Sequence, residues 1–138
     1  MNIKKKFLDE IIKQALDEDP NECCGIMGIS GDNVEKLYQM TNVEASPFRY
    51  RMDPKELYET VNDIEDIGLE VGVIYHSHTH SPAYPSETDV RIATWEDGTS
   101  VWPDTLYVLV SLINHENPDV RAFSLTDGVV QEENLNVS

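Results

Sequence analysis

A short apolar stretch, Val-Gly-Val-Ile-Tyr at residues 71–75, leads directly into the triplet His76-Ser77-His78. Its valines and isoleucine favour an extended conformation, so we expect a strand over residues 71–76. Alternate residues of a strand point to the same face, and the two imidazoles would therefore lie side by side, with Ser77 directed away from them. The sequence predicts a pair of neutral metal ligands at the end of a strand.

A loop interrupted by Pro82 and Pro85 follows, and Ser86-Glu87-Thr88-Asp89 then has the residue types and spacing of the first turn of a helix. Such a turn would let Asp89 swing back as a third ligand. Two histidines and one carboxylate leave one position of a tetrahedral cation open, which is where a metal ion can activate water. Each feature alone has a simpler explanation, because Ser86 with Asp89 is also an ordinary helix cap.

The chain is strongly acidic. Its 138 residues include 26 Asp and Glu against 10 Lys and Arg, which gives a formal net charge of -16. Nucleic acid and anionic membranes both require neutralisation of phosphate, so this charge disfavours them as partners. A neutral or basic protein is a more compatible partner, although acidity is also typical of a soluble surface without a specific role.

Length and cysteine usage indicate the organisation and the compartment. A chain of 138 residues is long enough for one hydrophobic core and too short for two, so we expect a single domain over residues 1–138. No signal peptide or membrane-spanning segment is evident, which favours the cytoplasm. The only cysteines, Cys23 and Cys24, are neighbours that would point to opposite faces of an extended segment, and free thiols agree with that compartment.

Hydrophobic periodicity predicts the order of the elements. A first amphipathic helix is expected over residues 3–16, a second from the cap Asp53-Pro54 to Gly68, and a third, shorter one from Ser86, which would turn Val90, Ile92 and Ala93 toward the core. Turn residues separate the strands, which are expected at residues 22–29, 34–40, 48–52, 71–76, 106–113, 120–125 and 129–133. The predicted fold is α+β, a mixed and largely antiparallel sheet flanked by helices.

The histidine triplet, seven further residues, Ser86, two more residues and Asp89, together with a glutamate in an upstream apolar strand, form one pattern. With this pattern the sequence resembles the JAMM metalloproteases, the zinc-dependent branch of the MPN-domain family. The resemblance covers essentially the whole chain and implies an MPN fold with one zinc ion per chain. It implies His76, His78 and Asp89 as zinc ligands, Ser86 beside the bound water and the oxyanion, and Glu22 as general acid and base.

Further stretches, including Val73 to Thr79 and Leu106 to Ser111, are similar to the small prokaryotic members that release cysteine from a sulfur-carrier protein. This implies hydrolysis of the amide bond at the C-terminus of a ubiquitin-like sulfur carrier, with cysteine or a lysine-linked conjugate as the leaving group. The carrier tail could lie along a strand edge, with residues 41–50 and the segment after the third helix as candidate contacts. The stretch from Trp95 to Pro103 is longer than in those members and could affect substrate access or a homodimer.

Two other functions stay open. A non-catalytic MPN-type module could use the same groove to bind a protein, and two histidines with one carboxylate are also the ligand set of non-haem iron oxygenases. Among the neighbours of the motif, His80 is expected in a loop rather than as a fourth ligand, since one position must stay open. Cys23 and Cys24 are expected to be small buried thiols, and His115 has no evident partner.

Overall fold

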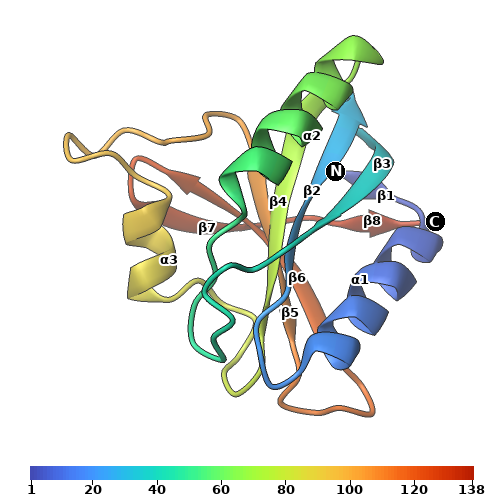
Figure 1. Ribbon diagram of the computed structural model, residues 1–138, viewed down its shortest axis with the longest axis vertical. Coiled ribbons are helices and arrows are strands. Elements are labelled where there is room, and N and C mark those ends of the chain that lie inside the picture. The colour runs from blue at the N-terminus through green and yellow to red at the C-terminus, as the bar shows by residue number, and fades with distance from the viewer.

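The computed structural model describes residues 1–138 and contains three helices and one eight-stranded mixed sheet (Figure 1). The strand order is β7-β6-β5-β4-β2-β3-β1-β8. The helices are α1 (Lys5–Glu18), α2 (Pro54–Asp66) and α3 (Glu87–Ile92). The strands are β1 (Asn2–Ile3), β2 (Cys24–Ser30), β3 (Asn33–Met40), β4 (Glu70–His78), β5 (Leu106–Ser111), β6 (Asp119–Thr126), β7 (Val129–Glu133) and β8 (Asn136–Val137).

Strand β4 lies in the middle of the sheet, antiparallel to β2 and parallel to β5. The pairs β2/β3, β5/β6 and β6/β7 are also antiparallel, whereas β1 pairs in parallel with β3 and β8. β4 has a partner on each side over residues 73–76, which satisfies the backbone polar groups of this part of the strand. The histidine triplet therefore sits on a well-supported strand that ends at the lower edge of the sheet in Figure 1.

The helices cover both faces of the sheet. On one face, α1 packs Phe7, Ile11 and Ala15 against a buried cluster that includes Val73 and Tyr75 of β4. On the other face, the intervening strand residues pack with α2 and with the end of α3, and the buried members of this second cluster are Ile26, Ile64, Ile74, Ala83, Ala93, Tyr107, Leu109, Phe123 and Leu125. From Val73 onward, the alternation along β4 thus assigns the odd-numbered residues to the α1 face and the even-numbered residues to the α2 and α3 face, whereas Val71 packs with the second cluster. None of the three helices has the length and hydrophobicity that a membrane crossing requires.

Gly25 and Tyr75 explain how closely α1 can approach the sheet. A Cβ atom at Gly25 would lie 2.2 Å from the Tyr75 ring, so only glycine leaves room for that ring. The Tyr75 hydroxyl then donates to Gln14 Oε1 of α1 at 2.6 Å, and Gln14 Nε2 donates to the Cys24 carbonyl at 3.1 Å. This buried chain of hydrogen bonds fixes α1 against the strand pair that carries the candidate site.

Both strand pairs joined by predicted turns, and both predicted long helices, are present. Asp53 caps α2, and Gly68 has a positive φ of 80° just after that helix. Two expectations about single residues were wrong: Ile3 belongs to β1 rather than to the first helix, and Ile92 is 51% exposed rather than directed to the core. The short strands β1 and β8, which pair the two chain ends, were not predicted.

The strand expected at residues 48–52 is a loop, in which only Met52 forms an isolated bridge with Asn42. The side chain of Asn42 explains this conformation, because its Oδ1 accepts from the backbone N–H groups of Glu44 and Arg51, both at 3.0 Å. Its Nδ2 donates to the carbonyls of Glu22 and Arg49 at 3.0 and 3.1 Å. One buried amide thus satisfies backbone groups that a strand ladder would otherwise pair.

Candidate metal centre

Three potential ligand atoms converge where β4 ends and α3 begins. The Nε2 atoms of His76 and His78 are 3.1 Å apart, and Asp89 Oδ2 lies 3.2 Å from the first and 3.0 Å from the second. The two histidines share the face of β4 that is covered by α2 and α3, and both are buried. Ser77 points to the opposite face, where its hydroxyl accepts the Cys23 N–H at 2.8 Å.

The start of α3 fixes the position of Asp89. Ser86 is the N-cap, and its Oγ accepts the Asp89 N–H at 3.0 Å, while Asp89 Oδ2 accepts the Ser86 N–H at 2.9 Å. This reciprocal capping box aims one carboxylate oxygen at the histidines. Since the Ser86 oxygen acts here as an acceptor, its own hydroxyl hydrogen remains free to donate.

The two imidazoles are held in different ways. His78 Nδ1 lies 2.8 Å from the Pro82 carbonyl, a partner that places the hydrogen on Nδ1 and leaves the Nε2 lone pair for a cation. His76 Nδ1 is buried and has no hydrogen-bond partner, but the Tyr50 ring stacks on this imidazole with centroids 4.4 Å apart and an interplanar angle of 25°. Packing therefore orients His76 and a hydrogen bond orients His78.

Electrostatics within this group favour a cation. Burial by itself would raise the pKa of Asp89, but the hydrogen bonds to His76 and His78 outweigh it and hold that pKa well below its usual range. Burial lowers the pKa of His76, so this ring is neutral at neutral pH. Burial also disfavours the charged form of His78, yet the Asp89 carboxylate more than compensates and raises its pKa. A metal ion would therefore compete with one proton on His78.

The arrangement fits a metal ion in its donor chemistry and spacing. Ligand atoms about 2.1 Å from a tetrahedral zinc lie roughly 3.4 Å from one another. The three donor atoms of His76, His78 and Asp89 are 3.0 to 3.2 Å apart, so a small outward movement would accommodate the ion. These residues are also the group of His, Cys, Asp and Glu side chains whose donor atoms lie close enough to share one cation.

Glu22 lies just before β2 rather than within it. In the antiparallel register of β2 and β4, Cys24 is opposite His76, and two residues earlier this register brings Glu22 opposite His78. The side chain is buried, and its Oε1 has no hydrogen-bond partner. Burial raises the pKa of Glu22 from an ordinary 4.5 to about 8. A carboxyl group that changes protonation near neutral pH is suited to proton transfer.

The other residues singled out in the sequence lie outside this group. His80 is exposed after the end of β4, and its Nδ1 is 2.8 Å from the Thr79 hydroxyl. Cys23 and Cys24 are free, buried thiols, and burial raises the pKa of Cys23 to about 12, which makes a reactive thiolate unfavourable. His115 has a partner that the sequence did not reveal, since its Nε2 lies 3.1 Å from Asp19 Oδ2.

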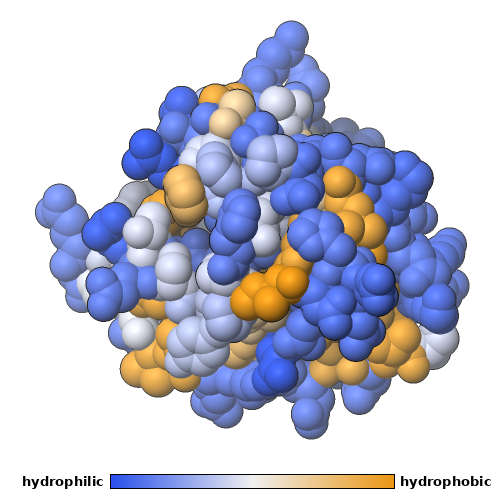
Figure 2. Space-filling model, turned by 90° about the horizontal axis from the view of Figure 1, so that it is seen from below, coloured by the Kyte–Doolittle hydropathy of each residue, from blue (hydrophilic) through white to orange (hydrophobic).

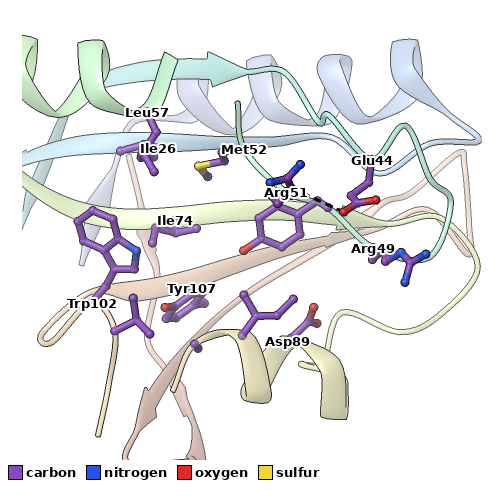
Figure 3. Close-up of a pocket in the computed structure, with 14 residues that line it drawn as sticks. Ile26, Glu44, Arg49, Arg51, Met52, Leu57, Ile74, Asp89, Trp102 and Tyr107 are labelled. Atoms are coloured by element: carbon purple, nitrogen blue, oxygen red, sulfur yellow. Dashed lines mark ion pairs between the residues drawn. The ribbon is translucent and has the colours of Figure 1, made fainter. Parts of the chain in front are cut away.

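We call His76, His78 and Asp89 the ligand group. An apolar pocket of about 330 Å³ adjoins the ligand group at Asp89, and the sequence did not predict this cavity. Figure 3 shows Trp102 at one end of it and Arg49 with Asp89 at the other. Both of the segments considered above as substrate contacts contribute to its lining, through Tyr50 and through Trp102. Its floor and walls are mainly hydrophobic, with Ile26, Met52, Leu57, Ile74, Ile92 and Tyr107 among the lining residues.

The surface at this end of the molecule is mostly hydrophilic and carries several separate hydrophobic areas (Figure 2). Among the exposed apolar side chains in the chain are Phe48 at 79% and Trp95 at 61%. Because the hydrophobic areas are interrupted by polar residues, this face does not present one broad apolar surface.

Sequence comparisons identify relatives over nearly the whole chain. The model of the prokaryotic homologs of the JAB domain matches residues 4–126. The CysO-cysteine peptidase of Mycobacterium tuberculosis is 39% identical over 137 residues, covering 98% of this chain and 89% of the relative. A probable TtuB-protein conjugate cleaving protease of Thermus thermophilus is 31% identical over 127 residues, covering 91% of this chain and 76% of the relative.

Solved structures agree with this relationship. A protein from Desulfitobacterium hafniense superimposes with a TM-score of 0.84 at 31% identity, covering 99% of this chain and 92% of that one. A JAB1/MPN domain protein from Archaeoglobus fulgidus has the same fold, with a TM-score of 0.65 at 18% identity, covering 100% of this chain and 97% of that one. These likenesses confirm the predicted family and fold. The chain belongs to the family of prokaryotic homologs of the JAB domain.

Proposed function

We propose that this protein is a zinc-dependent peptidase that hydrolyses the amide bond at the C-terminus of a ubiquitin-like sulfur-carrier protein. The observation that carries the proposal is the convergence of three metal-ligand atoms, from His76, His78 and Asp89, beside the buried and proton-binding carboxyl group of Glu22. The relatives named as a CysO-cysteine peptidase and a TtuB-protein conjugate cleaving protease support this substrate class.

The proposed cofactor is one zinc ion per chain, held by His76, His78 and Asp89. Two imidazoles and one carboxylate are a common ligand set of catalytic zinc, and they leave one position free. When bound, zinc would lower the pKa of water and polarise the carbonyl group of the substrate. The ionised Asp89 and the neutral His76 are suited to hold a divalent cation at neutral pH.

The chain's own residues would provide the proton transfers and the oxyanion contact. Glu22 would take a proton from the attacking water and return one to the departing amine, because an unprotonated amine leaves poorly. The C–N bond breaks, and the oxygen from water becomes part of the new carboxylate of the carrier. The Ser86 hydroxyl, which accepts from Asp89 and keeps its hydrogen, would donate to the oxyanion.

The apolar pocket between the loop at residues 42–52 and α3 is the proposed site for the carrier tail. It reaches Asp89 at one end, so a tail lying in it would bring its last carbonyl to the ligand group. Trp102 lies at the far end of the pocket (Figure 3), and Val101 also contributes to its lining. We therefore assign the stretch from Trp95 to Pro103 a role in substrate access.

The proposed compartment is the cytoplasm. Cys23 and Cys24 are free in the fold and point into buried surroundings, which agrees with a reducing environment. Their position also leaves them without a ligand role, because neither belongs to the three-residue group at the end of β4.

Replacement of Glu22 by Gln tests the mechanism. The zinc-loaded protein is incubated with each sulfur-carrier protein of its own genome, extended by cysteine or linked to lysine, and cleavage is followed by mass. Wild-type protein should release the carrier, and E22Q should be slower by about 10² to 10⁴-fold while its zinc content is unchanged. Equal turnover by E22Q would contradict the role of Glu22. Absence of cleavage by the wild type would favour a non-catalytic binding module.

Metal analysis of the purified protein is a separate test, because it distinguishes the zinc peptidase from a non-haem iron oxygenase.

A further inference from the structure

Most basic side chains of this acidic protein are neutralised by a neighbouring carboxylate. Six of the ten Lys and Arg residues form ion pairs. The four without one are Lys4 and Lys6, beside the start of α1, and Arg49 and Arg91. In a chain with 26 carboxylates, two arginines that meet no internal anion are unusual, and both belong to the same end of the molecule as the ligand group.

Arg49 and Arg91 line one cavity of about 350 Å³, together with Ser46, Phe48 and Thr88. We call this the arginine cavity. Its lining includes no Asp or Glu; the acidic residues that share a cavity with Arg49, which are Glu44 and Asp89, line the apolar pocket instead and form no ion pair with it. The contact between Arg91 Nη2 and the Thr88 hydroxyl, at 3.4 Å, leaves most of the Arg91 donors free. The cavity is therefore prepared for an anion.

The arginine cavity lies next to the catalytic groups on two sides. Thr88 directly precedes the proposed ligand Asp89, and the carbonyl of Ser46 accepts the Glu22 N–H at 2.9 Å. Arg49 also lines the apolar pocket at the end where Asp89 lies (Figure 3). Arg49 thus lines both cavities: the apolar pocket, which Asp89 also lines, and the arginine cavity, which Thr88, the residue before Asp89, also lines.

We propose that Arg49 and Arg91 bind the free carboxylate of a C-terminal leaving amino acid, which makes the protein a carboxypeptidase specific for one residue beyond the carrier. This inference rests on the proposed function and selects between its two leaving groups. A single C-terminal amino acid carries its carboxylate one carbon from the departing amine, so the anion stays close to the scissile bond. The ε-amine of a lysine-linked conjugate has no such neighbour.

The chemistry of arginine suits this role. A guanidinium group can donate two parallel hydrogen bonds to one carboxylate and stays charged at every relevant pH. Two such groups would also offset the repulsion that a chain of net charge -16 exerts on an anionic substrate. The volume of the cavity, about 350 Å³, leaves space for a small side chain beside the carboxylate, next to the exposed Phe48 ring.

The test compares two forms of one substrate, the sulfur carrier of the same genome extended by a single cysteine, either as the free acid or as the C-terminal carboxamide. Zinc-loaded full-length protein is used, and kcat/KM is measured by mass. The wild type should prefer the free acid by roughly 10- to 100-fold, the value of a charged hydrogen bond. R49Q and R91Q should lose most of this preference, because KM for the free acid should rise far more than KM for the carboxamide. Since Arg49 also lines the pocket for the carrier tail, the readout for each variant is the ratio of the two kcat/KM values.

Arg121→Gln is the matched control, because Arg121 is exposed on β6 and pairs with Asp119 and Glu132 away from the cavity. It should behave as the wild type with both substrates. Equal rates of the wild type on free acid and carboxamide, or an equal loss on both forms in R49Q and R91Q, would overturn the carboxylate site while leaving the peptidase function in place. Absence of cleavage of either form by the wild type would overturn both proposals.

Discussion

Helices α2 and α3 begin with similar capping groups but differ in their surroundings. At α2, the Asp53 carboxylate accepts the N–H groups of Lys55 and Glu56 at 2.8 and 3.4 Å, and it has no further partner. At α3, the carboxylate belongs to Asp89 in the first turn, and the oxygen that accepts the Ser86 N–H also faces both histidines. A cap can therefore serve only its own helix, or it can also aim a carboxylate at a second site.

The difference depends on what lies beside each helix start. The end of β4 brings His76 and His78 to α3, whereas Asp53 lies at the solvent-accessible start of α2. A capping box restricts the carboxylate to one orientation, which is the property that a metal ligand needs. Variants at the two helix starts should therefore lower the free energy of unfolding by similar amounts but differ strongly in their effect on activity.

The largest effect is expected from the paired variants Asp89→Ala and Asp53→Ala. Loss of Asp89 removes a proposed ligand, so zinc binding should be lost and cleavage should fall by at least about 10³-fold, because a metal supplies several kcal/mol of transition-state stabilisation. D53A should retain full zinc content and turnover and lose about 1 kcal/mol of stability. Zinc content, carrier cleavage and thermal unfolding measure the three quantities. Full zinc occupancy in D89A would remove the distinction between the two helix starts.

Ser86→Ala sharpens the comparison, because it removes a cap and a proposed oxyanion donor together. Its stability cost should match that of D53A, at about 1 kcal/mol, while kcat should fall by about 10² to 10³-fold with zinc retained. Ser86→Thr keeps the hydroxyl and should recover most of the activity. If S86A and D53A lowered kcat equally, the Ser86 hydroxyl would be only a cap.

The packing that orients His76 at the end of β4 can be removed without a change at either helix start. Tyr50→Leu removes the ring that stacks on His76, so zinc affinity should fall by about 10-fold, as for other groups that orient a ligand. Tyr50→Phe keeps the ring and should bind zinc as the wild type does. Tyr58→Leu, at a 70% exposed position of α2, is the control. Competition with a zinc-binding dye gives the affinities, and unchanged binding in Y50L would mean that packing does not orient His76.

The smallest effect concerns the metal-free protein. The folded state raises the pKa of Glu22 from 4.5 to about 8 and so binds more protons than the unfolded state between these values, which means that stability falls as pH rises from 4.5 to 8. E22Q lacks this loss of stability. The melting temperature of E22Q minus that of the wild type should therefore be several degrees larger at pH 8.5 than at pH 5. About 1 kcal/mol corresponds to roughly 3 to 6 °C in a domain of this size. Glu35→Gln, at an exposed position of β3, controls for the loss of one carboxylate. A constant difference between E22Q and the wild type would contradict the raised pKa.

Much of the fold followed from local signals. The period of the apolar residues predicted α1 and α2, and Gly31 and the Asp127-Gly128 pair, all three with positive φ, marked the two hairpin turns. Strands β1 and β8 were missed because two residues are too few for any period, and they form only by pairing the chain ends. The loop at residues 42–52 was missed because a side chain, that of Asn42, replaces a strand partner.

In the candidate site, too, some features could be predicted from the sequence and others could not. The spacing of His76, His78 and Asp89 was sufficient to expect that their side chains meet, and their roles as zinc ligands stay a prediction for metal analysis. The stacking of Tyr50 on His76 and the position of Arg49 and Arg91 around one cavity had no sequence signal. Each depends on how a loop folds over a strand end, which is decided by hydrogen bonds between residues far apart in the chain.

The amide of Asn42 has a consequence for how specificity can change in this family. It ties the loop at residues 42–52 to the Glu22 carbonyl and to the loop's own far end, so the loop's path is anchored at its base. Residues between the anchors, such as Phe48, are exposed and carry none of these bonds. Substitutions there can alter which leaving group is accepted while Glu22, the proposed proton-transfer residue, keeps its place. Substrate range and the geometry of the proposed site can then evolve separately within one short loop.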